Sequence, residues 1–209
     1  GQEPRADRWK DRSSTGEGAG GAARYTWQYL AAGYAAVWAT ENTREAVFDA
    51  MTRRETYGTS GTRMTVRFFG GYDYVPSDAQ SPRLAEVGYA KGVPMGGDLK
   101  PAAAGTTPAF LVAALKDPQG ANLDRIQVVK GWLDASGKAQ EKVYDVVWSG
   151  DRKPGKDGKL PPVGDTVDVA RASYTNSIGA AELAAVWKDP DFKPGQRAFY
   201  YARVIEIPT

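Results

Sequence analysis

Short apolar runs separated by turn residues set the strongest limit on what this chain can fold into. In RMTVRFF, which begins at Arg63, apolar and polar side chains alternate, so that Met64, Val66 and Phe68 fall on one side. This period of two residues is typical of a strand with one buried face. The turn DASG at 134–137 separates two further runs and predicts a hairpin. Other strands are expected at 83–89, 109–116, 125–133, 142–149, 165–174 and 197–207.

So many short strands favour a fold that is mainly β with some α, built around an antiparallel β-sandwich. One helix is expected among these strands, at 179–187, with Leu183, Val186 and Trp187 on one face. The last run, AFYYARVIEIP from Ala198, is apolar on both faces. Strands that are buried on both faces read in this way, and we therefore expect this run at the centre of its sheet.

The chain before residue 62 has a different character, and three regions are expected in all. Residues 1–22 are rich in glycine, serine and charge, which predicts a flexible arm. Residues 23–61 contain a helix ending near Leu30, a strand at 34–38 and a second helix, the order of an α/β fragment. Residues 62–209 form the sandwich-like domain. If 23–61 belongs to a larger α/β domain, its strand lacks neighbours within this chain and leaves an apolar surface or a sheet edge uncovered.

The second helix of this fragment starts with a capping signal. Asn42 is a good N-cap residue, and Glu45 lies three positions later, as in a capping box. The apolar residues Val47, Ala50 and Met51 share one face, with Phe48 beside it.

The composition excludes several classes of chemistry. The 209 residues include no histidine, so a histidine general acid or base is excluded, and no cysteine, which argues against a zinc site. Carboxylate sites for Mg²⁺ or Ca²⁺ stay open. The net charge of +2 arises from 27 basic and 25 acidic residues that are well mixed, which gives no sign of a nucleic-acid partner. No apolar run approaches the roughly 20 residues that a membrane-spanning helix needs.

Several long stretches carry a family resemblance. The first is GYAAVWATENTREAVFDAMTRRETYGTSGTRMTVRFF, residues 33–69. Four others follow in the expected order: GVPMGGDL at 92–99, AFLVAALKDPQGANLDRIQVVKGWLD at 109–134, EKVYDVVWSG at 141–150 and DPDFKPGQRAFYYARVIEIPT at 189–209. They resemble the C-terminal part of the bacterial domain of unknown function 3604 family. Members of that family carry a metal-dependent domain related to polymerase-and-histidinol-phosphatase (PHP) phosphoesterases.

The resemblance implies that this chain is the C-terminal third of a longer protein. The histidine-rich metal ligands of the family lie upstream, so the chain itself would hold no cofactor, whereas the complete protein would bind a divalent metal. Residues 23–61 would be the closing strand and helix of the PHP-like domain. The partner of this chain would be the upstream part of the same protein. Many relatives look exported, which favours a periplasmic or exported location for the complete protein.

The resemblance also points to a candidate substrate-side loop. In the related metallohydrolases, the segment equivalent to residues 57–61 follows the last helix of the catalytic domain. Thr59, Ser60 and Arg63 would then lie near the substrate, with the planar cation of Arg63 available to a phosphate or carboxylate. The alternative is an ordinary loop, in which Gly61 supplies a turn and Arg63 pairs with a surface acid. A serine–histidine–aspartate triad at Ser60 is excluded because the chain has no histidine.

Two functions from different classes fit these observations. The first is the C-terminal fragment of a metal-dependent, phosphoesterase-like hydrolase that is inactive alone. The second is a non-catalytic β-sandwich module that binds a carbohydrate or a protein partner. Exposed aromatic residues on the predicted hairpin, among them Trp132, Tyr144 and Trp148, would favour the module, although core packing is the simpler role for them. An uncovered strand within 23–61 would favour the fragment.

Overall fold

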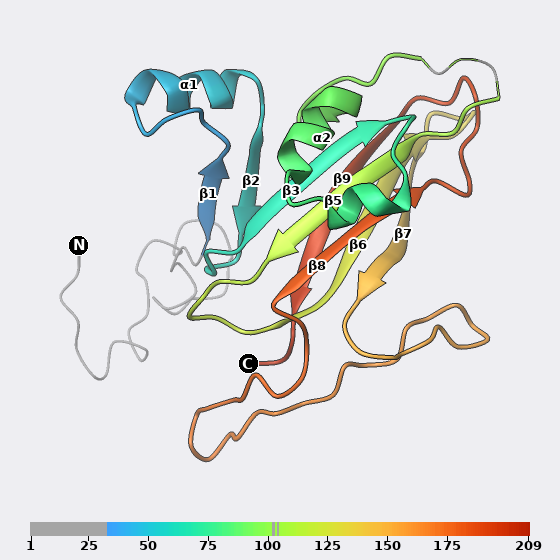
Figure 1. The fold of residues 1–209 in the computed structure, drawn as a ribbon. Coiled ribbons are helices and arrows are strands. Elements are labelled where there is room, and N and C mark those ends of the chain that lie inside the picture. The colour runs from blue at the N-terminus through green and yellow to red at the C-terminus, as the bar shows by residue number, and fades with distance from the viewer. Residues whose placement is uncertain (1–32, 102, 104) are drawn as a thin grey trace, which may run out of the picture.

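The computed structural model describes residues 33–101, 103 and 105–209, and the predicted arm and first helix lie outside this part of the chain. The described strands form three antiparallel sheets, with the orders β1-β2, β4-β3-β5-β8 and β7-β6-β9 (Figure 1). The expected mainly β fold with some α is confirmed. In chain order the elements are β1 (Tyr34–Val37), α1 (Arg44–Thr52), β2 (Thr56–Thr59), β3 (Thr65–Gly71), the 3-10 helix η4 (Pro76–Gln80), α2 (Leu84–Lys91), β4 (Gly92–Pro94), β5 (Ala109–Leu115), β6 (Leu123–Leu133), β7 (Ala139–Trp148), β8 (Glu182–Lys188) and β9 (Ala198–Glu206).

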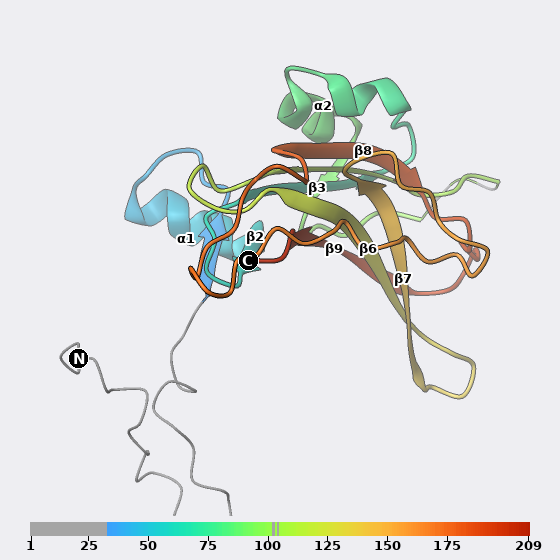
Figure 2. The same cartoon turned by 90° about the horizontal axis from the view of Figure 1, so that it is seen from below.

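The four-stranded and three-stranded sheets pack face to face and enclose the main hydrophobic core (Figure 2). Val66 and Phe68 of β3, and Met64 just before this strand, are all buried in this core, as their alternation predicts. The facing sheet contributes Ile126 and Val128 of β6, neither of which is exposed. Full burial of one such aliphatic side chain contributes about 1.5–3 kcal/mol. Apolar alternation on paired strands therefore produces the sandwich.

The outer face of the four-stranded sheet carries a second apolar cluster, which α2 and η4 cover (Figure 2). The strand expected at 83–89 is wrong, because this segment lies largely in α2. Gly88 brings the helix close to the sheet, since a Cβ there would come within 2.6–2.7 Å of the Phe69 ring atoms. The Tyr89 ring packs edge-on against the same phenyl ring, with centroids 5.2 Å apart. The periodicity of this segment alone favours a strand. The segment instead folds as a helix that packs against Phe69.

Tyr74 joins the sheet to α2 and supplies a pH-dependent contribution to stability. Its side chain is 1% exposed, and its hydroxyl donates a hydrogen bond to the Gly88 carbonyl at 2.6 Å. Burial, with the nearby Asp78 carboxylate, raises the pKa of Tyr74 from 10.0 to about 12. A raised pKa in the folded state contributes stability that is complete below pH 10 and is lost as the pH rises through about 12.

We expect Tyr74→Phe to lower the free energy of unfolding by about 1 kcal/mol at pH 8, because a buried hydrogen bond is lost. At pH 11 the difference between the two proteins should shrink, because the phenylalanine has no proton to lose. Urea unfolding of both proteins at the two pH values measures this. An unchanged difference would show that Tyr74 does not contribute to the alkaline loss of stability.

The predicted hairpin is confirmed, but three neighbouring predictions are not. β6 and β7 pair on either side of the 134–137 turn, where Gly137 has a φ of 79° and its N–H donates to the Asp134 carbonyl. The helix expected at 179–187 is wrong: its residues largely form β8, which pairs with β5 along seven residues. The strand expected at 165–174 is also wrong, with only an isolated bridge between Asp168 and Ser173. β9 was expected at the centre of its sheet and lies at the edge.

β1, α1 and β2 form a separate unit beside the sandwich (Figure 1). β1 pairs with β2 in antiparallel register, so the strand that was expected to lack neighbours has one. The N-cap of α1 is Thr43, not Asn42, because the Thr43 hydroxyl accepts the Ala46 N–H at 3.3 Å. The expected apolar face is only partly buried, since Ala46 and Ala50 are the buried residues of α1. Phe48 and Met51 are 67% and 52% exposed.

Candidate functional site

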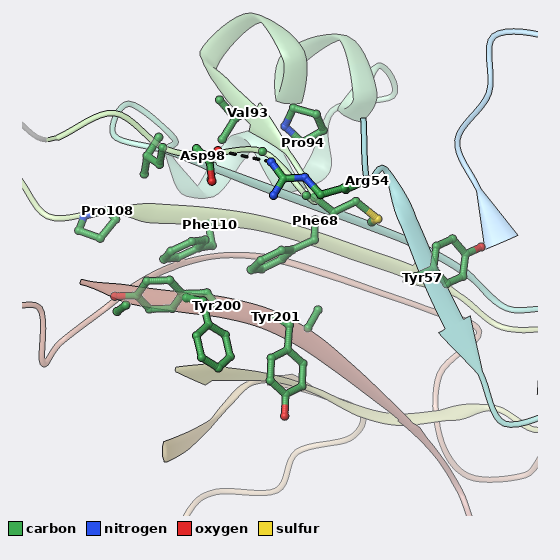
Figure 3. A pocket seen from close by; sticks show the side chains of 18 of the residues that line it. Arg54, Tyr57, Phe68, Val93, Pro94, Asp98, Pro108, Phe110, Tyr200 and Tyr201 are labelled. Atoms are coloured by element: carbon green, nitrogen blue, oxygen red, sulfur yellow. Dashed lines mark hydrogen bonds and ion pairs between the residues drawn. The ribbon is translucent and has the colours of Figure 1, made fainter. Parts of the chain in front are cut away.

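The sandwich is open along one side, and the opening forms a groove of about 1470 Å³. Strands β3 and β4 line one wall, β9 lines the other, and β2 lies at one end (Figure 3). Residues 95–101, 103, 105, 106 and 108 and residues 192 and 194–197 also contribute to the lining. The groove therefore follows the line where the two sheets separate.

Stacked aromatic rings form the floor of the groove (Figure 3). The rings of Phe68 and Phe110 are parallel to within 3°, with centroids 5.4 Å apart. The Tyr200 ring lies 4.4 Å from that of Phe110 and comes from the opposite sheet. Such a surface favours an apolar or aromatic ligand, because aromatic contacts add about 0.5–1.5 kcal/mol beyond the area they bury.

The upper rim of the groove is polar. Arg54 donates to Asp98 at 3.4 Å, and both side chains are well exposed (Figure 3). Gly96 sits directly against the Arg54 backbone with a φ of 80°, so a side chain there would be both strained and obstructed. The turn after β4 therefore depends on a glycine to hold the rim against the end of α1.

The predicted substrate-side loop lies partly in the groove. Thr59 and Ser60 line it, and the Thr59 hydroxyl donates to the Thr62 carbonyl at 2.6 Å. Arg63 lies outside the lining: its guanidinium carbon is 5.6 Å from the centroid of the Tyr34 ring. The Arg63 backbone N–H donates to Asp117 at 2.7 Å, and this bond is the largest cause of the lowered pKa of Asp117. The structure thus brings Thr59 and Ser60 together and directs Arg63 elsewhere.

Glu206, at the end of β9, lines the groove and has a buried carboxylate oxygen, Oε1, without a hydrogen-bond partner among the described residues. Burial raises the pKa of Glu206, and the Asp117 carboxylate raises it further. An unpaired buried carboxylate oxygen costs about 1–3 kcal/mol. The buried oxygen lies beside the 117–120 turn, because a Cβ at Gly120 would come within 3.4 Å of it.

A second polar group, the anchor cluster, attaches the β1–α1–β2 unit to the sandwich. It consists of Trp38, Arg53, Glu55, Arg67 and Tyr89. The Glu55 carboxylate is buried, accepts a hydrogen bond from Tyr89 and lies 3.5 Å from Arg53 and 3.6 Å from Arg67. The Arg67 guanidinium carbon is 3.2 Å from the Trp38 ring centroid, a close cation–π contact. Burial, followed by the hydrogen bond to Glu55, raises the pKa of Tyr89.

The described residues do not provide a metal-binding set. No three aspartates or glutamates are grouped so that they could hold a metal ion, in a chain without histidine or cysteine. None of the described helices is long and apolar enough to cross a membrane.

Sequence reasoning missed most of the groove. Phe68 and Phe110 were placed on strands, but no local signal shows that two sheets separate beside them. Glu206 gave a partial signal, as an acid at the end of the largely apolar run of β9. The aromatic residues on the predicted hairpin, Trp132, Tyr144 and Trp148, are all half-buried.

Comparison with known proteins identifies one family. The family model described as "Protein of unknown function (DUF3604)" matches residues 2–209. Neither the search of curated proteins nor the search of solved structures found a match to the chain.

Proposed function

The chain belongs to the DUF3604 family of proteins of unknown function, and we propose that it is the non-catalytic C-terminal part of a metal-dependent hydrolase. The upstream part would hold a divalent metal, which would supply an activated water for hydrolysis of a phosphoester or similar bond. Among the described residues, no three acids are grouped so that they could hold a metal ion. The resemblance alone places the ligands in the upstream part of the protein, and no catalytic step is assigned to this chain. The PHP-like relationship rests on the sequence resemblance alone.

One observation carries the proposal: the β1–α1–β2 unit leaves apolar surface uncovered. The side chains of Tyr34, Phe48 and Met51 are 51%, 67% and 52% exposed. Among the described residues, β1 pairs with β2 alone and its other edge has no strand. Large exposed apolar side chains and an open strand edge favour contact with further protein. The same unit is attached to the sandwich through the buried Glu55, so it is positioned and not loosely tethered.

The role of this chain would be to place Thr59 and Ser60 beside the substrate. Both line the groove at the β2 end, next to the β1 edge where further protein would pack. Ser60 is exposed, and its hydroxyl is suited to donate a hydrogen bond to a phosphoryl oxygen. Arg63 is assigned a structural role because its guanidinium faces Tyr34.

The first experiment uses the protein expressed from its complete gene, with Mn²⁺ and bis(p-nitrophenyl) phosphate as the probe. We expect the complete protein to hydrolyse the ester, EDTA to abolish turnover, and the 209-residue chain to be inactive. Ser60→Ala should lower kcat/KM about tenfold, the effect of losing one hydrogen bond to a charged group. Ser136→Ala is the matched control, because Ser136 is equally exposed but sits at the tip of the β6–β7 hairpin.

Two results would contradict the proposal. Turnover by the 209-residue chain alone would place the metal ligands within it. A complete protein that stays inactive with Mn²⁺ and with Zn²⁺ would favour the second candidate function, a carbohydrate-binding module.

The observation that favours the second candidate is a pair of exposed aromatic rings on β9. Phe199 and Tyr201 are 62% and 42% exposed, and their rings are parallel to within 12° with centroids 6.4 Å apart. The Phe199 ring occupies the space over Gly131 of β6, where a Cβ would overlap it. Flat aromatic faces of this kind suit the C–H groups of a sugar ring, because the ring face is electron-rich. Calorimetric titration of a non-hydrolytic protein with a soluble oligosaccharide such as cellohexaose tests this candidate.

A further inference from the structure

β9 is an unusual edge strand. It is nine residues long, mostly apolar and paired only with β6 among the described strands. None of its nine residues is fully buried, although its inward side chains pack against the main core. Long apolar edge strands attract a further strand, and proteins normally shorten, charge or cover them. We propose that an extended segment of the same protein, from outside residues 33–209, adds to β9 as a fourth strand and fills the groove.

The count of strands in the two sheets supports this proposal. The sandwich is closed on its other side, where β7 contacts β8 and the Tyr144 and Trp187 rings lie 4.8 Å apart. On the open side β9 contacts β3, while β4 contacts β3 and α2. β4 faces the groove through Val93 and Pro94 (Figure 3). One strand added beside β9 would lie opposite β4 and give two sheets of four strands each.

The chemistry of the groove defines the segment. Its inward side chains would meet Phe68, Phe110 and Tyr200, so every second residue should be apolar. Its backbone would pair with the free edge of β9, the mode of recognition by strand addition. At the far end the pairing would stop near Glu206, whose Oε1 is buried beside the turn at Gly120.

A second copy of the chain fits this place poorly. In antiparallel pairing of two β9 edges about a two-fold axis normal to the sheet, each copy brings its own four-stranded sheet with it. Because β3 lies over β9, the β3 strand of the second copy would occupy the position of β4. A single strand that is not flanked by a sheet avoids this collision. The further protein proposed to pack on the β1–α1–β2 unit would lie at the β2 end of the same groove and is the source assigned to the strand.

Hydrogen–deuterium exchange on the protein expressed from its complete gene tests the inference. In an antiparallel edge strand about half of the amides point away from the partner and exchange rapidly, whereas a central strand protects nearly all of them. β7 and β6 of the same sheet supply the edge and central references. We expect β9 to resemble β6. If β9 exchanges like β7, no strand is added and the inference is wrong.

A photo-crosslinking amino acid at Met95, which lines the groove, identifies the source of the strand. The expected product is an intramolecular crosslink to a peptide outside residues 33–209. The same group at Val169, which is 87% exposed and outside the groove lining, is the control and should not give that product. A crosslink that joins two chains, or none beyond the control, would overturn the assignment. The inference rests on the proposed function in requiring further protein in the same polypeptide. Neither readout uses catalysis, so a failure of the inference and a failure of the proposed hydrolysis are distinguishable.

Discussion

Replacing Asp189 by asparagine is expected to lower the free energy of unfolding by about 3–5 kcal/mol. Asp189 and Lys130 form an ion pair at 2.6 Å, and their side chains are 0% and 2% exposed. The Asp189 carboxylate also accepts hydrogen bonds from the Tyr200 hydroxyl at 2.7 Å and from the Asp191 N–H at 2.9 Å. Asparagine preserves the shape but removes the charge, and the Lys130 ammonium is then buried without a counter-charge. Urea unfolding followed by circular dichroism measures the loss.

Two further variants show whether the buried charge is the cause. Lys130→Met combined with Asp189→Asn removes both charges and should recover most of the lost stability, because an apolar replacement of a buried pair is often neutral. Lys142→Met is the control, since Lys142 pairs with Asp191 at the surface and its side chain is 50% exposed. Its unfolding free energy should stay close to that of the parent protein. If the double variant is as unstable as Asp189→Asn, the pair stabilises through shape and not through charge.

The buried pair also shows what the sequence could not reveal. Lys130 is a charged residue in the run RIQVVKGWL, and alternation places it on the core side together with Val128. Lysine side chains are mostly exposed in proteins. The burial of Lys130 depends on its ion pair with Asp189, which is 59 residues away in the sequence. No local pattern connects the two residues. Periodicity predicts which segments form strands, but it does not predict which residues that are distant in the sequence contact one another.

The errors in secondary structure have the same origin. The residues of β8 include alanine, leucine and glutamate, which are good helix formers, so the local preference is for a helix. The segment becomes a strand because its register with β5 is continuous from Lys188 to Glu182, beside the core. α2 is the opposite case, in which a short apolar segment folds as a helix against Phe69.

The structure divides the candidate loop, and its substrate-side role stays a prediction. The resemblance placed Thr59, Ser60 and Arg63 together, and the structure separates Arg63 from the other two by engaging its backbone with Asp117. The groove itself arises from the unequal strand numbers of two sheets, a property of topology. The expectation that β9 is central follows from its apolar faces, and it would be met in the complete protein if a strand is added there.

Replacing Arg67 by methionine is expected to release the β1–α1–β2 unit from the sandwich. The buried Glu55 would then keep only Tyr89 and the half-exposed Arg53 as partners. Removal of one partner from a buried ion pair costs about 3–5 kcal/mol, and the loss of a cation–π contact with Trp38 adds to it. The cost should appear locally, because the sandwich core lies on the other side of β3. Hydrogen exchange of β1 and β2 should accelerate while that of β5 and β6 stays unchanged.

Two other arginine variants separate the contributions of charge and shape. Arg67→Lys keeps the charge but loses the planar group that stacks on Trp38, so its exchange rates should be intermediate. Arg54→Met removes an exposed pair with Asp98 from the same unit and should leave exchange in β1 and β2 near that of the parent. Equal acceleration in Arg54→Met and Arg67→Met would mean that the buried carboxylate does not hold the unit in place. In that case Thr59 and Ser60 would not be positioned by the sandwich, and the argument that this chain orients a substrate-side loop would lose its physical basis.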